Sequence, residues 1–390
     1  MSKIEDLIKQ YCPNGSEWKR LGDVCSFITG FAFKSNTFHT EQSEELIGIV
    51  KTTNIQDMNI SEEKMVYVDI NAYPKLKIDS YLIPKGRIVI GMSGTIKIGV
   101  NNNDTEYLLN QRVGMFVPNE SVLSNAYLKH LLHMVVKDFN SITDDGSVKN
   151  LSSDNIKNFQ IPIPPLPIQE EIVRILDKFT ELEKELEKEL EMRKKQYEFY
   201  RDKLLTFGDD VERKRLGDVC ILSAGGDAPK THMSKIKSDE YKYPIYSNGI
   251  GDNALYGYTY EYKISSPCVT VAARGTIGWA ALRTDPFYPI VRLICVLPKD
   301  YGELNVAFLK YFIDTIEFSV PEGGIPQLTV PMLKNLVIPV PSLQEQQRIV
   351  EILDTFDTLT TDLTQGLPAE IKMRRMQYEY YRDYLFGLLK

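Results

Sequence analysis

The sequence predicts an α+β fold with an internal pseudo-twofold repeat. We expect two globular domains of mixed sheet and helices, separated by two long helices that pair as an antiparallel coiled coil. Three observations predict this. The segment KRLGDVC occurs twice without change, at 19–25 and 214–220. A longer segment at 151–179 matches 328–356, with 14 of 29 positions identical. Each longer copy continues into residues with the apolar spacing of a helix that packs on another helix.

The length of the chain, 390 residues, also indicates more than one domain. Single hydrophobic cores stop growing at roughly 250–300 residues. The repeat sets the predicted boundaries: a first globular domain, a central helical region, a second globular domain and a C-terminal helical region, at 1–150, 151–207, 208–327 and 328–390.

The first long helix is predicted from 168 to 204, because apolar residues recur there mostly at steps of four and three. Four prolines between 162 and 167 keep the preceding chain extended. The second copy runs from about 343 to 388, where Gly366 and Pro368 should break or kink it. Each helix has one apolar seam, so pairing with each other is the simplest arrangement. The alternative is that each packs into the core of its own domain.

Both globular domains contain short apolar runs around a glycine turn. Residues 81–100 and 267–282 each read as strand, turn and strand, with the tripeptide GTI at 94–96 and at 275–277. Helices are predicted at 125–139 and at 305–316. This mixture of elements supports the α+β prediction for each domain.

The charge excludes a protein that coats nucleic acid by bulk attraction, since the formal net charge is −7. No one of the segments 1–150, 151–207, 208–330 and 331–390 is positive overall. No apolar run approaches the ~18–20 residues that span a bilayer, and the first residues do not form a signal peptide. The five cysteines are widely spaced and include no CxxC pair, which favours free thiols in a reducing compartment. We therefore expect a cytoplasmic protein with no membrane partner.

The sequence contains no clear pattern for a nucleotide or metal site. The phosphate-binding pattern GxxxxGK[ST] and the dinucleotide pattern GxGxxG after a strand are both absent. His130 and His133 lie three residues apart in a predicted helix without an evident third ligand. We expect them to pack or to lie at the surface rather than to bind metal. The chain itself is thus expected to bind no cofactor and no metal.

The polar residues near the glycine turns suit a different chemistry, the recognition of base edges in DNA. Arg and Lys pair with guanine, and Asn and Gln pair with adenine, in the major groove. Glycine turns let the backbone approach phosphates closely. The candidates in the first domain are Lys34, Ser93, Thr95, Lys97, Gln111, Arg112 and Lys149. Those in the second are Lys230, Ser247, Asn248, Arg274, Thr276, Arg292 and Gln327.

Two other functions compete with a non-catalytic DNA reader. One is an enzyme with its own nuclease or methyltransferase site fused to a reader. The tripeptide DPF at 285–287 is faintly similar to an amino-methyltransferase motif but lacks its second proline. Asp227, Glu240 and Lys242 have the residue types of a nuclease cluster, yet similar Glu-x-Lys triplets recur elsewhere. The other is a dimeric helical adaptor, which the divergence of the two globular domains argues against.

The repeated motifs together resemble the specificity subunit of type I restriction–modification systems. They are KRLGDVC, the GTI turns, Asn110-Gln111-Arg112, IPIPPLPIQEEIVRILD and RKKQYEFYRDKLL. The resemblance spans the whole chain. It departs from the family pattern at Lys97, where a glycine often follows GTI, as Gly278 does in the second domain.

The resemblance implies two target-recognition domains, each reading one half of a split site in double-stranded DNA. The paired helices would set the gap between the half-sites and dock two modification subunits. Methylation, and ATP-driven translocation with cleavage, would belong to the modification and restriction subunits. S-adenosylmethionine, ATP and Mg would then be bound only by those partners.

Overall fold

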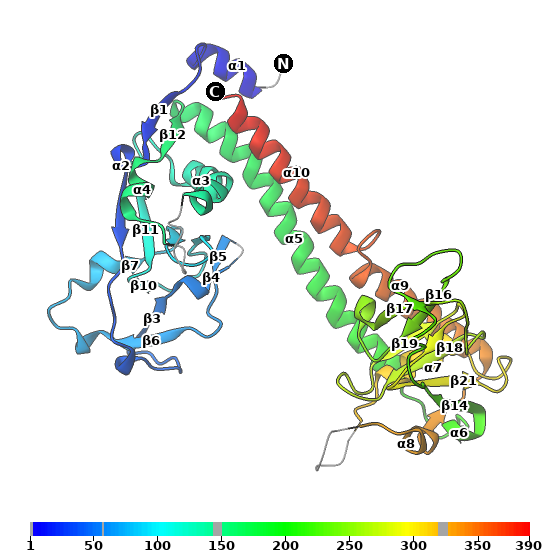
Figure 1. The fold of residues 1–390 in the computed structure, drawn as a ribbon. Helices are drawn as coiled ribbons and strands as arrows, with labels where there is room; N and C mark the ends of the chain where they lie inside the picture. The colour runs from blue at the N-terminus through cyan, green and yellow to red at the C-terminus, as the bar shows by residue number, and fades with distance from the viewer. Residues whose placement is uncertain (1–2, 57, 143–149, 319–326) are drawn as a thin grey trace. The chain divides into compact units, whose positions relative to one another are not determined.

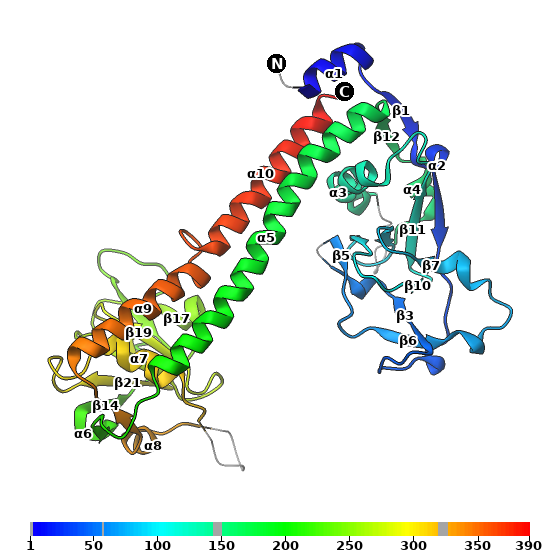
Figure 2. The ribbon, with the colours of Figure 1, turned by 180° about the vertical axis from the view of Figure 1, so that it is seen from behind.

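The computed structural model describes residues 3–56, 58–142, 150–318 and 327–390. The chain divides into two compact units, which we call the first and second units. They consist of 1–185 with 371–390, and of 186–370. Figures 1 and 2 show the elements of both units from opposite sides.

The first unit is built on two main sheets with helices packed beside them. The strand orders in the described residues are β2-β11-β8-β9-β5-β4 and β6-β3-β10-β7, and β1 pairs with β12. Its elements are α1 (Lys3–Tyr11), β1 (Glu17–Arg20), α2 (Leu21–Val24), β2 (Cys25–Thr29), β3 (Leu46–Val50), β4 (Ile55–Gln56), β5 (Met58–Ile60), β6 (Val66–Asp69), β7 (Leu82–Ile83), β8 (Ile88–Gly91), β9 (Ile98–Val100), β10 (Tyr107–Leu109), β11 (Val113–Pro118), α3 (Asn125–Ser141), α4 (Ser153–Asn158), β12 (Gln160–Ile163), the first half of α5 (Leu166–Leu204) and most of α10 (Leu367–Gly387).

The second unit repeats this plan with fewer strands. Its described strands form the orders β14-β21-β18-β19 and β15-β17-β16-β20, and β13 pairs with β22. Its further elements are β13 (Arg213–Arg215), α6 (Leu216–Val219), β14 (Cys220–Ala224), β15 (Met233–Ser234), β16 (Tyr243–Tyr246), β17 (Leu255–Thr259), β18 (Cys268–Ala272), β19 (Ala280–Arg283), β20 (Tyr288–Pro289), β21 (Leu293–Pro298), α7 (Val306–Asp314), α8 (Val330–Lys334), β22 (Val337–Pro339) and α9 (Leu343–Thr361). The mixed α+β prediction is thus confirmed in both units.

The predicted helices are present with small shifts at their ends. The helix expected from 168 is α5, which begins two residues earlier at Leu166 and ends at Leu204 as expected. The second long helix is divided at the predicted place: α9 ends at Thr361 and α10 begins at Leu367. The prediction at 305–316 was too long, because Asn305 caps α7 with its side chain and the helix ends at Asp314.

The repeated LGDV sequence forms a short helical turn that lies against a neighbouring helix in each unit. The nitrogen of Leu21 donates to the Phe159 oxygen at 2.8 Å, and that of Leu216 to the Leu336 oxygen at 2.7 Å. A Cβ atom on Gly22 would lie 2.9 Å from the Lys157 Cβ. A Cβ atom on Gly217 would lie 3.1 Å from the Lys334 Cβ, so the motif makes a similarly close approach in both copies.

The long helices pair within each unit, and the residue order shows that α5 and α10 run antiparallel. In the first unit, Phe179 stacks on Tyr381 with ring centroids 5.1 Å apart, and Glu183 forms an ion pair with Arg375. Figures 1 and 2 both show α10 beside α5. In the second unit, Tyr200 of α5 stacks on Phe356 of α9 at 5.6 Å. The same packing is therefore repeated on equivalent residues.

A buried polar cluster joins α3 to both long helices in the first unit. The His130 side chain is 1% exposed. Its Nδ1 lies 2.9 Å from the Tyr378 hydroxyl, and its Nε2 lies 2.9 Å from Asp177 Oδ1. Although burial disfavours the charge of Asp177, hydrogen bonds from His130 and Lys129 lower its pKa to about 2. The expectation that His130 packs is confirmed.

This cluster differs from its equivalent in the second unit. There Tyr311 of α7 donates its hydroxyl to Asp354 Oδ1 of α9 at 2.6 Å, so a tyrosine stands where the first unit has a histidine. Burial lowers the pKa of His130, and it lowers the pKa of His133 to about 4. The cluster that attaches the first unit to its helices thus contains an imidazole, and the equivalent cluster of the second unit contains a phenol.

No helix in the described part of the chain is both long and apolar enough to cross a membrane.

The stability of the first unit should depend on pH through these two histidines. Their pKa values are lower in the folded state, so the unfolded chain binds protons more readily as the pH falls below about 6.5. The free energy of unfolding should therefore decrease between pH 6.5 and 4, by about 3 kcal/mol for His133 alone. We expect urea unfolding, followed by Trp18 fluorescence in a Trp279→Phe background, to show this slope.

The double variant His130→Gln with His133→Gln should flatten the slope between pH 6.5 and 5. His39→Gln, a change at an exposed histidine of the same unit, serves as the control and should leave the slope unchanged. An equal slope in all three proteins would contradict the assignment.

Candidate nucleic-acid interface

Several of the candidate side chains lie on loops that the same backbone hydrogen bonds hold in each unit. In the first unit, the Met92 nitrogen donates to the Arg112 oxygen at 2.8 Å, and the Leu151 nitrogen to the Met92 oxygen at 2.9 Å. In the second unit, Ala273 takes the place of Met92. Its nitrogen donates to the Arg292 oxygen and its oxygen accepts from the Leu328 nitrogen, both at 2.9 Å. Three loops thus meet in one repeated frame.

The glycine turns next to this frame have matching backbone conformations. Gly94 and Gly275 both have φ of +72°, a region that side chains with a Cβ rarely adopt. Thr95 and Thr276, which follow these glycines, are both exposed. The sequence prediction that the two GTI turns are equivalent is confirmed in geometry.

The second unit brings most of its candidate residues together through side-chain contacts. Asn248 Nδ2 donates to the Arg274 oxygen at 2.7 Å, and Thr276 Oγ1 donates to the Asn248 oxygen at 3.1 Å. Arg274 Nε donates to Gln327 Oε1 at 2.8 Å. The oxygen of Arg292 belongs to the shared frame. These polar groups converge on one surface although they come from four separate stretches of the chain.

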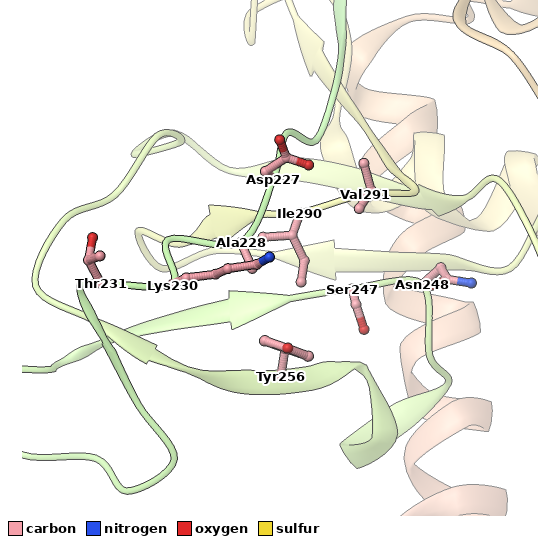
Figure 3. Close-up of a pocket in the computed structure, with 9 residues that line it drawn as sticks. All are labelled: Asp227, Ala228, Lys230, Thr231, Ser247, Asn248, Tyr256, Ile290 and Val291. Atoms are coloured by element: carbon pink, nitrogen blue, oxygen red, sulfur yellow. The ribbon is translucent and has the colours of Figure 1, made fainter.

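A cleft of about 680 Å³ adjoins this group in the second unit. Figure 3 shows Lys230, Ser247 and Asn248 around it, with the ring of Tyr256 on the same side as Ser247. The Lys235 Nζ lies over the Tyr256 ring, 4.0 Å from its centroid, and Tyr256 is 42% exposed. The carboxylate of Asp227 also lines the cleft. Its lysine, amide and exposed aromatic side chains are of the kinds that suit contact with nucleic acid.

The first unit brings together fewer of its candidates. Ser93 forms a backbone bridge with Asn150, and the Arg112 oxygen belongs to the shared frame. Thr95, Lys97, Gln111 and Arg112 are all exposed on neighbouring loops. The turn that carries Thr95 and Lys97 is held from α3, because the Ile96 nitrogen donates to Asn140 Oδ1 at 3.0 Å.

One candidate of the first unit, Lys34, is not joined to this group. Lys34 is exposed, and its backbone nitrogen donates to the Tyr73 hydroxyl at 3.0 Å, next to a separate aromatic cluster of Phe31, Phe33 and Tyr73. Lys149 lies outside the described residues. Lys34 lies in a loop whose position depends on contacts with residues distant in the sequence, which no local sequence pattern predicts.

Sequence reasoning missed an aromatic surface in the second unit. Tyr256, Tyr260 and Tyr262 are 42–49% exposed, and Tyr243 packs against Tyr262 at 4.9 Å. Lys242 covers the Tyr243 ring at 5.1 Å. The signal was present as tyrosines and lysines interleaved between 235 and 263, a pattern typical of surfaces that stack on bases or line a nucleic-acid backbone.

Sequence reasoning also missed a buried glutamine that attaches each unit to its long helix. Gln169 Nε2 donates to the oxygens of Val122 and Pro164, both at 2.8 Å, and Gln169 Oε1 accepts from the Ser124 nitrogen at 2.9 Å. Gln346 makes the equivalent three bonds in the second unit. Both side chains are fully buried. The signal was their identity at one aligned position of the repeat.

The residues that suggested an enzyme lie in different surroundings, since Asp227 lines the cleft described above and Glu240 and Lys242 are both exposed. Phe287, of the DPF tripeptide, is fully buried and packs with Cys268 and Cys295, so its ring cannot contact a substrate. The described residues contain no group of three or more His, Cys, Asp or Glu that could hold a metal ion. The repeated frame thus carries different polar side chains in the two units.

Comparison with known proteins identifies the family. Residues 13–192 and 208–373 both match the type I restriction modification DNA specificity domain. The chain belongs to this family. It is 37% identical over 277 residues to a putative type I specificity subunit of Mycoplasma pneumoniae, covering 67% of this chain and 81% of that protein. It is 36% identical over 273 residues to the EcoR124I/EcoR124II specificity subunit of Escherichia coli, covering 63% and 67%.

Solved structures share the fold. One, from work on complex assembly and conformational transition of the type I restriction–modification system, has a TM-score of 0.60 at 18% identity, covering 96% of this chain and 98% of that chain. A type I restriction–modification S subunit from M. genitalium has a TM-score of 0.54 at 14% identity, with 96% of each chain covered. The two sequence relatives of this chain given above are named as specificity subunits. Nothing in these comparisons favours the enzyme alternative.

Proposed function

We propose that this chain reads a bipartite site in double-stranded DNA, with residues 1–150 and 208–327 as two target-recognition domains that each read one half. One observation carries the proposal. The same three-loop frame occurs in both units, but the side chains it presents differ, with Ser93 and Asn150 in one and Arg274 and Gln327 in the other. A conserved frame with divergent polar side chains is what two readers of different base sequences require.

In this proposal, the other candidate residues divide into two roles. Exposed lysines such as Lys97 and Lys230 contact phosphates and fix the register of the protein on the DNA. Gln111, Asn248 and Thr276 lie beside the frame and contact base edges. DNA deformation adds to these contacts. No segment of the chain is strongly basic, so partner subunits supply much of the affinity for phosphate.

We also propose that residues 151–207 and 328–390 dock two modification subunits, and that restriction subunits join that complex. Support comes from an exposed apolar stripe that occurs on both long helices. Met192 and Phe199 of α5 are each 61% exposed, and their equivalents on α10, Met373 and Tyr380, are 61% and 67% exposed. Two copies of one apolar stripe suit two copies of one partner.

Methylation and ATP-driven cleavage then take place on those partners, which bind S-adenosylmethionine, ATP and Mg. This chain contributes the choice of sequence and the separation of the half-sites. Its α5 runs continuously from Leu166 to Leu204, which is about 58 Å of helix at ~1.5 Å per residue.

Replacing residues 1–150 with the first domain of another family member should change only one half of the recognised DNA site. The two sets of candidate side chains belong to separate units, so neither should affect the bases read by the other. Mapping methylated sites in cells that carry the hybrid with its partner subunits measures this. A change in both halves would rule out independent reading.

Phe199→Glu and Tyr380→Glu should each remove one modification subunit from the complex, and the double variant should remove both. Both side chains are largely exposed in this chain, so the introduced glutamates cost nothing by burial in the free protein. Docking of the partner would bury their charge, which is unfavourable. Native mass spectrometry gives the stoichiometry. Lys194→Glu, which places a glutamate at an exposed position on the opposite side of α5 from Met192, is the control and should retain two partners.

Deletion of residues 183–186 should alter the gap between half-sites. It shortens α5 by about 6 Å, close to two base pairs at ~3.4 Å each. Methylation of oligonucleotides with different spacers measures the preferred gap. An unchanged preference would show that α5 does not set the spacing.

A further inference from the structure

We propose that Arg274, held in place by Gln327, reads a guanine in the half-site recognised by the second unit. This inference rests on the proposed function, and it names the base read at one position of that site. It starts from the frame described above, in which Arg274 and Gln327 stand where the first unit has Ser93 and Asn150.

Gln327 orients the guanidinium of Arg274 through one edge. Arg274 Nε donates to Gln327 Oε1 at 2.8 Å, and Nη2 donates to the same oxygen. A guanidinium has five N–H donors in a rigid plane, so these two bonds leave the outer edge able to make two parallel hydrogen bonds. Guanine presents two acceptors, O6 and N7, side by side in the major groove.

The backbone of Arg274 is held as well. Asn248 Nδ2 donates to the Arg274 oxygen at 2.7 Å, and Thr276 Oγ1 donates to the Asn248 oxygen at 3.1 Å. The arginine is therefore fixed at both its main chain and its side chain before any ligand arrives. Such preorganisation lowers the entropy cost of binding and favours a single base geometry.

The surroundings leave Arg274 accessible and positively charged. It is partly exposed, and the next residue, Gly275, has no side chain to cover it. Gln327 is an uncharged acceptor, so it orients the guanidinium without neutralising it. A carboxylate at this position would have opposed the approach of a phosphate-lined groove.

The first unit cannot read a guanine in this way, because Ser93 has neither the reach nor the paired donors of an arginine. The two half-sites should therefore differ at the base pair that this position of the frame meets. Arg112 of the first unit and Arg292 of the second occupy equivalent places in the frame, so this arginine position does not create the difference.

The test compares two arginine-to-lysine variants in the assembled complex with modification subunits. Arg274→Lys keeps the positive charge but loses the planar fork. Arg348→Lys makes the same change on α9, where Arg348 is exposed and paired with Glu345 at 2.6 Å. Methylation rates are measured on oligonucleotides carrying every single-base substitution in the half-site assigned to the second unit by exchange of residues 208–327.

We expect an obligatory G·C pair in that half-site. Arg274→Lys should reduce discrimination at this one pair by roughly 5- to 150-fold, the range for losing a bidentate contact. Gln327→Met, which removes the acceptor and leaves Arg274, should reduce it at the same pair by a smaller factor. Arg348→Lys should match the parent protein at every position.

Two results would overturn the inference while leaving the proposed function intact. One is a second half-site without an obligatory G·C pair. The other is a folded Arg274→Lys complex, with normal partner stoichiometry, that discriminates as the parent does at every G·C pair. Failure of the proposed function is a separate result, namely that the parent complex methylates sites that are not bipartite.

Discussion

The attachment of each globular part to its long helix depends on one buried glutamine. Gln169 and Gln346 satisfy a proline carbonyl before the long helix, a loop carbonyl, and the backbone nitrogen of the residue that caps α3 or α7. Both are fully buried, where an unsatisfied amide is costly. A substitution that lost these bonds would leave several polar groups buried without partners. Glutamine therefore occupies this position in both copies, while the surrounding loops differ.

This rigid attachment explains how the loops can diverge. The strands and the frame of backbone bonds around Met92 and Ala273 do not depend on the side chains that point outward from the loops. Backbone hydrogen bonds hold the loops in place, and the loop side chains remain free to specify different chemistry. Ser93 and Arg274 occupy the same position of this frame, and the backbone bonds around them are the same.

The helices combine two kinds of surface. Stacked rings such as Phe179 with Tyr381, and Tyr200 with Phe356, form the seam between paired helices. Met and aromatic side chains one step around the helix stay exposed in both copies. The polar cluster at His130 differs between the units, since Tyr311 stands in the place of His130 in the second. The repeat is thus preserved in the helix seam and altered in this cluster.

The sequence by itself determined the repeated architecture, the α+β character, the extent of α5 and the break near Gly366. Those features depend on local periodicity, helix-breaking residues and identical strings, which are visible along the chain. It also indicated which polar residues flank the glycine turns. Only the tertiary structure decided which of them meet: Arg274 bonds to Gln327 across 53 positions, and His130 to Tyr378 across 248. No local pattern specifies such contacts, because they depend on how distant strands and helices pack.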